Sequence, residues 1–167
     1  MFTSIAQFVE AWNEESRITR EVMTALTDKS LSQEITPGHR TLGRLAWHLV
    51  TSIPEMMQHT GIKLEEVKPD SALPKSAGAI AAAYAAVASA MLARLRAEWK
   101  DESLGIRDEM YGEKWERRFT LQVLVQHQIH HRGQMSVLMR QAGLRVPSIY
   151  GPAKEDWEQY GRPAPEV

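Results

Sequence analysis

Two histidines four residues apart, His127 and His131, are the residues whose type and spacing suggest chemistry. On a helix they project about 40° apart, on the same side as Leu124 and Leu138. Neutral imidazole is a common ligand for zinc, nickel, iron and copper, and such a pair can bind one ion. The spacing therefore fits a divalent metal site, whose third ligand must come from another helix. It fits hydrogen-bonded histidines in a protein core as well.

The other four histidines occupy different kinds of position. His130 projects about 60° to the far side of His127, so we expect it at the edge of the helix face. His39 follows Pro-Gly in a loop, and His59 lies in the last turn of a predicted helix. His48 is in the middle of that helix, at the edge of its apolar face, where it could contact a neighbouring helix or water.

The histidines must be positioned by helices, because apolar residues recur along the chain at spacings of three and four. This period predicts four helices, at about 4–26, 41–61, 76–100 and 120–143, the last with Thr120 as N-cap. The polar stretch 63–74 is long enough to cross one end of a bundle. We therefore predict an all-α fold, an antiparallel four-helix bundle with a long crossover between the second and third helices. Residues 110–119 suggest a short extended segment before the fourth helix.

Length and composition narrow the class of protein. The 167 residues suit one domain, 1–167, with a turn-rich tail from about residue 144. A net charge of −1 with interleaved signs argues against nucleic acid as a partner. Early acidic residues and the lack of an apolar run near ~20 residues argue against a signal peptide and a membrane, so we expect a cytoplasmic protein. Without cysteine, the available metal ligands are His, Asp and Glu.

Three segments together resemble a known family. LGRLAWHL around His48, HQIHHRGQ around His127 and His131, and VPSIYGPAKEDW in the tail are similar to the DinB/YfiT-like family of metal-dependent enzymes. The resemblance covers essentially the whole chain and does not extend to the DNA polymerase that shares the name. It implies a four-helix bundle in which His48, His127 and His131 hold one divalent ion with open positions for water or substrate. His130 matches a position that is not a ligand in the family.

The resemblance also implies a reaction class. Three imidazoles without a carboxylate would leave Zn²⁺ or Ni²⁺ cationic and coordinatively open. Family members with known chemistry use a low-molecular-weight thiol as cosubstrate, which here must be external because the chain has no cysteine. We expect a metal-dependent transferase that moves such a thiol to small electrophiles. Gln134 projects to the side of the ligands and is the candidate polar contact; Trp47 and Tyr84 are either walls of the cleft or core residues.

The sequence leaves two other functions open and also bears on the oligomeric state. A metal-dependent hydrolase would need a general base near the ion. The sequence does not tell how far the candidate carboxylates lie from the histidines; they are Glu14, Glu15, Glu55 and Asp108. A non-catalytic bundle stabilised by metal could instead bind a small molecule or a partner. The spacing of Ala81, Ala85 and Ala88 permits close helix approach and, with the resemblance, predicts a homodimer.

Overall fold

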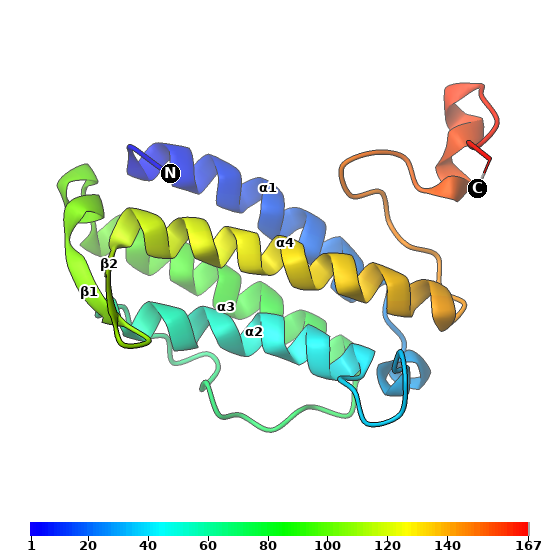
Figure 1. Cartoon of the computed structure of the whole chain (residues 1–167), viewed down its shortest axis with the longest axis horizontal. Helices are drawn as coiled ribbons and strands as arrows, with labels where there is room; N and C mark the ends of the chain where they lie inside the picture. The colour runs from blue at the N-terminus through cyan, green and yellow to red at the C-terminus, as the bar shows by residue number, and fades with distance from the viewer. Residues whose placement is uncertain (167) are drawn as a thin grey trace.

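The computed structural model describes residues 1–166, and the protein is mostly helical. Four long helices make up most of this part of the chain (Figure 1): α1 (Ile5–Thr24), α2 (Leu42–Gln58), α3 (Ala77–Glu98) and α4 (Arg117–Gln141). There are also three short 3-10 helices. η1 (Asp28–Ser32) follows α1, η2 (Asp101–Gly105) follows α3, and η3 (Lys154–Tyr160) lies in the C-terminal tail. The prediction of a helical protein is confirmed in this coarse form.

The long helices lie side by side, and α1 and α2 each pack against both α3 and α4. Figure 1 shows α1 and α4 running in one direction and α2 and α3 in the other. Two hydrogen bonds agree with this: the N–H of Ile5 donates to Asp101 (2.7 Å), and the N–H of Ala77 donates to Asp28 (2.7 Å). Since α2 and α3 are parallel, the connection 59–76 returns along the length of the molecule.

The first three helices begin where the sequence predicts. Their N-cap hydroxyl groups accept a hydrogen bond from the backbone N–H three residues later, and the caps are Ser4, Thr41 and Ser76. Such a cap satisfies one of the N–H groups that a helix leaves unpaired at its start. Thr41 matters most for the site, because it fixes the start of the helix that carries His48.

The fourth helix begins earlier than predicted. Thr120 is not its N-cap but a fully buried residue within it, and the helix starts at Arg117 with Glu116 in extended conformation before it. The guanidinium of Arg117 pairs with Asp108 (2.8 Å), so the first turn is held by a partner nine residues earlier in the chain. Periodicity could not show this, because Arg117 and Arg118 add no apolar residue to the pattern.

The prediction of an all-α fold was wrong in one detail. A small antiparallel hairpin, β1 (Arg107–Met110) and β2 (Glu113–Glu116), precedes α4. Its two-residue turn has positive φ at both positions, 53° at Tyr111 and 86° at Gly112, as such turns require. The extended segment predicted at 110–119 is correct for residues 110 and 113–116, whereas residues 117–119 belong to α4.

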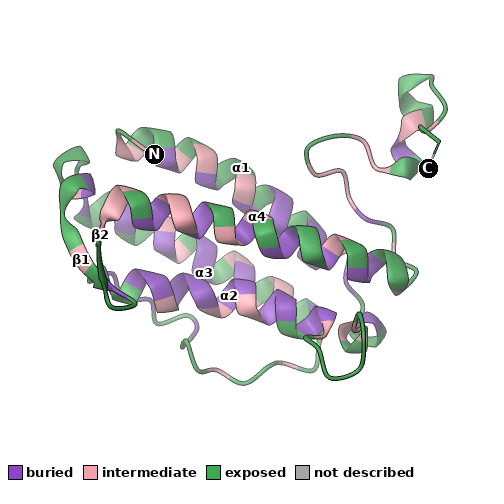
Figure 2. Cartoon of the chain, viewed as in Figure 1, coloured by how far each residue is buried: buried purple, intermediate pink, exposed green. Residues whose placement is uncertain are grey.

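The core lies between the four helices (Figure 2), where buried residues of each helix face the others. Its fully buried members include Phe8, Ile53, Ile80, Tyr84, Leu124 and Met135. Two polar side chains of α4, Gln128 and Arg132, are as deeply buried as these. They need hydrogen-bond partners inside the protein, and those partners determine how α4 is placed.

The sequence contains one apolar run that we did not expect. By length and composition alone α3 could cross a membrane, because an 18-residue window within it reaches a mean hydropathy of 1.5. Alanine accounts for much of that value. In this structure the larger apolar side chains of α3 are buried in the core, where α3 packs against α1 and α2. The tail contacts α1 and α4 through Tyr150, and η3 projects beyond the four helices (Figure 1).

Candidate metal centre

Three histidines from two helices meet at the middle of the molecule. His48 comes from α2, and His127 and His131 come from adjacent turns of α4. One ligand atom of each ring lies within 4.8 Å of the others. The ring centroids are 4.8 Å apart for His48 and His127, 4.7 Å for His48 and His131, and 4.5 Å for the pair on α4. The structure therefore brings together the three residues that the resemblance implied.

The spacing of the nitrogens fits a shared ion. The Nε2 atoms of His48 and His127 are 3.0 Å apart. Two nitrogens bound to one zinc ion at about 2.0–2.1 Å are themselves roughly 3 to 3.5 Å apart. Without an ion the two rings can share one hydrogen bond, so the same geometry serves a metal-free and a metal-bound protein. The donor set, three imidazoles, suits zinc, nickel, iron or copper.

The imidazoles are held in the neutral form that a metal requires. Burial, with the charges of neighbouring histidines and Arg40, lowers the pKa of His48 and of His127 to about 4. Burial also lowers the pKa of His131, although its hydrogen bond to Gln134 acts in the opposite direction. At neutral pH all three rings therefore present a lone pair without first losing a proton.

Gln134 selects the tautomer of His131. The Nδ1 of His131 lies 2.7 Å from the side-chain oxygen of Gln134, which can only accept a hydrogen bond. The amide nitrogen of Gln134 lies 3.1 Å from Nε2 of His130, which agrees with this orientation. Nδ1 of His131 then carries the proton, and its Nε2 is free to bind an ion. By contrast, Nδ1 of His127 is buried and has no hydrogen-bond partner among the described residues.

Gln128 fixes the register between the two helices that carry the histidines. Its side-chain nitrogen donates to the carbonyl of Leu49 (3.3 Å), and its oxygen accepts from the hydroxyl of Tyr84 (3.2 Å). Because Gln128 follows His127 and Leu49 follows His48, this bond aligns the rings. Gln128 was not predicted from the sequence, although a glutamine in the centre of the apolar face of a helix was an available signal.

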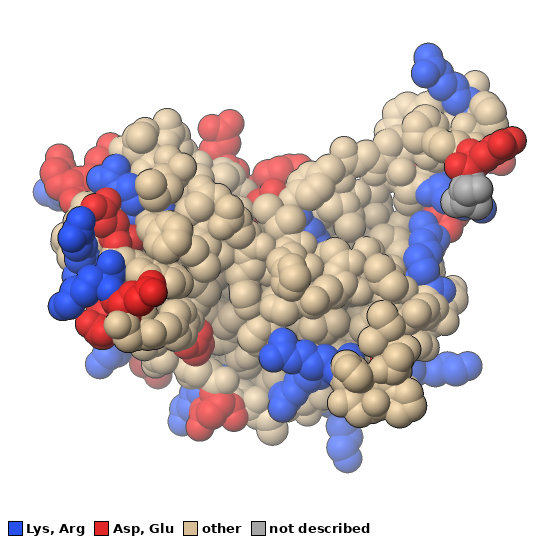
Figure 3. Space-filling model, in the orientation of Figure 1, with Lys and Arg blue, Asp and Glu red and all other residues tan. Residues whose placement is uncertain are grey.

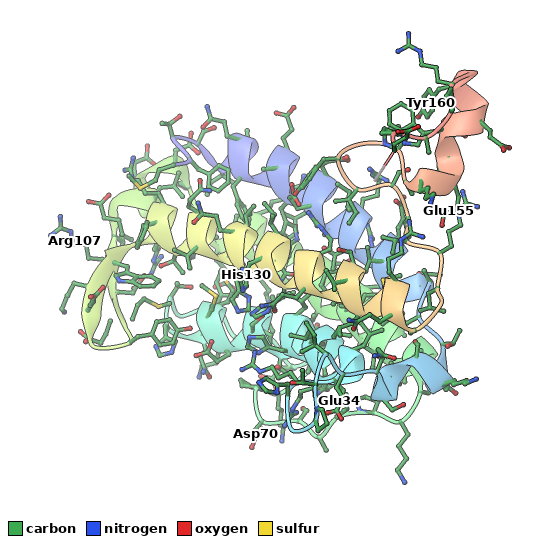
Figure 4. All side chains as sticks on the ribbon, turned by 45° about the vertical axis from the view of Figure 1, so that its right-hand side comes forward. Glu34, Asp70, Arg107, His130, Glu155 and Tyr160 are labelled. Atoms are coloured by element: carbon green, nitrogen blue, oxygen red, sulfur yellow. The ribbon has the colours of Figure 1, made fainter. Side chains whose placement is uncertain are left out.

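The remaining sequence candidates have different positions. His130, labelled midway along α4 in Figure 4, is exposed and lies outside the three-histidine group. Tyr84 is fully buried and hydrogen-bonded to Gln128, so it is a core residue and not a wall of a cleft. Trp47 lines a large cavity, with its indole N–H on the carbonyl of Ser71 (2.8 Å). The proposed role of Gln134 as a substrate contact stays a prediction.

The histidines border two hollows. A pocket of about 350 Å³ is lined by His131 and Gln134 together with apolar side chains of the 35–45 segment and α4. His48 lines a second cavity, of about 240 Å³, with Arg40, Arg44 and Thr51, and Arg40 lines both. Because both spaces are open to solvent, small molecules can reach the histidines from outside. Arg40 was not predicted, because the sequence gives no sign of which way its loop folds. Arg44 and Thr51 were not predicted either, although they lie four residues before and three residues after His48 on the same helix, a spacing that places them beside it.

The family model for DinB matches residues 1–166. The chain belongs to the DinB family. Within the DinB family, the uncharacterized protein YrdA of Bacillus subtilis (strain 168) is 42% identical over 167 residues, the whole of both chains.

Solved structures of DinB-like proteins have the same fold. The crystal structure of a DinB-like protein from Bacillus cereus ATCC 10987 is 46% identical, with a TM-score of 0.87 over 90% of this chain and 100% of that one. A DinB-like protein, YjoA of Bacillus subtilis, is 20% identical, with a TM-score of 0.68 over 87% of this chain and 99% of that one. At 20% identity, the similarity to YjoA shows a shared fold and nothing further.

Proposed function

We propose that the protein is a metal-dependent enzyme that transfers a low-molecular-weight thiol to small electrophiles. The observation that carries the proposal is the convergence of three neutral imidazoles beside spaces open to solvent. A metal site that only stabilises a fold is closed by a fourth protein ligand, whereas a catalytic site keeps a position open. The described ligand group consists of three histidines, His48, His127 and His131.

The proposed ion is divalent, zinc or nickel. When bound, it supplies the positive charge that lets a thiol lose its proton at neutral pH, where a free thiol with a pKa near 8.5 is mostly protonated. The thiol must come from outside, because the chain has no cysteine. In this proposal Gln134 orients His131, Gln128 holds the two helices in register, and Trp47 forms part of a cavity wall.

The hydrolase alternative has less support. Each carboxylate considered as its general base is engaged elsewhere: Glu15 with Arg132, Asp108 with Arg117, Glu14 with Arg17, and Glu55 with Tyr111. These partners hold the carboxylates as structural acceptors. A hydrolytic reaction would therefore have to use another base. A non-catalytic bundle that binds a small molecule would use the same two spaces, and the activity screen below distinguishes it from an enzyme.

We also propose the wider setting implied by the family. The four long helices would act as one antiparallel four-helix-bundle domain with a crossover between α2 and α3, in a cytoplasmic homodimer without a nucleic-acid or membrane partner. The support is the match of the family model over residues 1–166 and the packing of α1 and α2 on α3 and α4.

The test is a screen of metal-loaded protein with several cellular thiols and chlorodinitrobenzene as the electrophile. We expect turnover with at least one thiol, and its loss in His131→Ala, which removes one proposed ligand. Gln126→Ala, at an exposed position of the same helix, is the matched control. If no thiol gives turnover above the His131→Ala background, the transferase proposal fails and the hydrolase or non-catalytic alternative replaces it.

A further inference from the structure

Two arginines lie beside the histidine cluster without a carboxylate partner. Arg40 ends the loop before α2, and Arg44 is in the first turn of that helix, one turn before His48. Both line the small cavity that His48 and Thr51 also line. In the part of the chain that the structure describes, neither guanidinium forms an ion pair with Asp or Glu, unlike Arg132, which pairs with Glu15.

Both arginines lie close to the histidines. Arg40 and Arg44 line one cavity together with His48, and Arg40 also lines the pocket that His131 borders. Figure 3 shows basic side chains gathered over the beginning of α2. A divalent ion at the histidines would add two further positive charges. The local potential therefore favours a molecule that carries negative charge.

The space around the two arginines is large enough for such a molecule. A cavity of about 800 Å³ shares Arg40, Arg44 and Thr51 with the smaller one and extends to Trp47 and to the connection between α2 and α3. Volumes of this size are typical of small-molecule sites. Asp70, labelled on the connection in Figure 4, is the acidic residue of its lining, and it forms no ion pair with either arginine within residues 1–166.

The pocket that His131 borders is less polar. Arg40 lines it as well, but Arg44 does not, and its apolar lining consists of Ile35, Leu45, Val137 and Leu138. Such a pocket suits an apolar molecule of modest size. The two reactants of a thiol transfer would thus enter spaces of different polarity, each bordered by a histidine of the cluster.

We propose that Arg40 and Arg44 bind carboxylate groups of the thiol cosubstrate in the basic cavity, while the apolar pocket takes the electrophile. This assignment rests on the proposed function. Guanidinium groups match carboxylates with two parallel hydrogen bonds, so a thiol that carries carboxylates gains both affinity and orientation beside the histidines. A neutral thiol would gain neither from the arginines.

The first experiment measures binding and needs no turnover. Mercaptosuccinate and mercaptoethanol are each titrated by calorimetry into the wild-type protein as purified and into the variants Arg40→Gln and Arg44→Gln. The control variant is Arg96→Gln, which changes an exposed arginine at the far end of α3. We expect each of the two site variants to have an affinity for mercaptosuccinate about tenfold lower than that of the wild type, and a nearly unchanged affinity for mercaptoethanol. The control should bind both thiols as the wild type does. Equal mercaptosuccinate affinity in all four proteins would overturn the proposal.

The second experiment decides which reactant carries the carboxylate. Initial rates are measured with mercaptosuccinate or mercaptoethanol and with chlorodinitrobenzene or the carboxylate-bearing chloronitrobenzoate. We expect the arginine variants to raise KM for mercaptosuccinate alone. A raised KM for chloronitrobenzoate alone would overturn the assignment to the thiol. If no pair turns over, the thiol transfer itself fails, and the calorimetric difference still reports whether the arginines bind carboxylates.

Discussion

At the scale of the residue, the site depends on which ring nitrogen of each histidine carries the proton. Gln134 holds the proton of His131 on Nδ1 through a bond of 2.7 Å, and its own amide is oriented by His130. A partner of this kind raises the basicity of a ligating imidazole and fixes the plane of its ring. His127 has no such partner among residues 1–166, so the three histidines are unequally supported.

Replacing Gln134 by leucine should weaken metal binding without removing a proposed ligand. We expect the affinity for zinc to fall about 10- to 100-fold, the range found when a ligand-orienting group is lost. Competition with a chelating dye measures the change. Gln126→Leu, an exposed glutamine on the same helix, is the matched control. Equal affinities for the two variants would show that Gln134 does not orient His131.

The buried imidazoles also predict a pH dependence of the metal-free protein. His48 and His127 have a pKa of about 4 when folded, against about 6.5 in an unfolded chain. As the pH falls below 6.5 the unfolded chain takes up these protons first, so the free energy of unfolding decreases until about pH 4. Urea denaturation at pH 7 and pH 4.5 should reveal a smaller decrease for His127→Gln than for wild type. Parallel decreases would rule out this contribution.

At the scale of the element, Arg132 fastens α4 to α1 and to the tail. Its guanidinium is 1% exposed and bonds the carboxylate of Glu15 (2.5 Å), the hydroxyl of Thr19 (2.9 Å) and the hydroxyl of Tyr150 (2.5 Å). It directly follows His131 in the sequence. The contact therefore sets the rotation of α4 at the level of the histidines.

Arg132→Ala should be strongly destabilising, because it leaves the largely buried carboxylate of Glu15 without its partner. We expect a loss of about 3–5 kcal/mol in the free energy of unfolding. Arg140, on the same helix, forms an exposed ion pair with Glu155 of η3, so Arg140→Ala should cost about 1 kcal/mol or less. Urea denaturation of both variants tests the contrast. Similar losses for the two would mean that Arg132 does not hold α4 in place.

The sequence predicted the helices well because their apolar residues repeat, and it predicted the pairing of His127 and His131 from a spacing within one helix. It could not predict contacts between distant segments. The hairpin before α4 has two strands of four residues with one apolar side chain each, Met110 and Trp115, which is too few to show an alternating pattern. The bond from Gln128 to Leu49 and the place of Arg40 depend on how whole helices and a loop pack.

At the scale of the whole molecule, the homodimer remains a prediction. The spacing of Ala81, Ala85 and Ala88 motivated it, but Ala88 is 3% exposed and its carbonyl accepts a bond from Trp12 within the chain. Its side chain is therefore not available to a second copy, and the case for a dimer rests mainly on the family. Light scattering at micromolar concentration should report twice the mass of the chain. The mass of a single chain would contradict the dimer.

The metal content of untagged protein tests the central claim most directly. Wild type and His130→Ala, after purification and dialysis, are each expected to hold about one divalent ion per chain by elemental analysis. His48→Ala, His127→Ala and His131→Ala are expected to lose it, while circular dichroism confirms that they remain folded. Metal content in His127→Ala equal to that of wild type would contradict the three-histidine site.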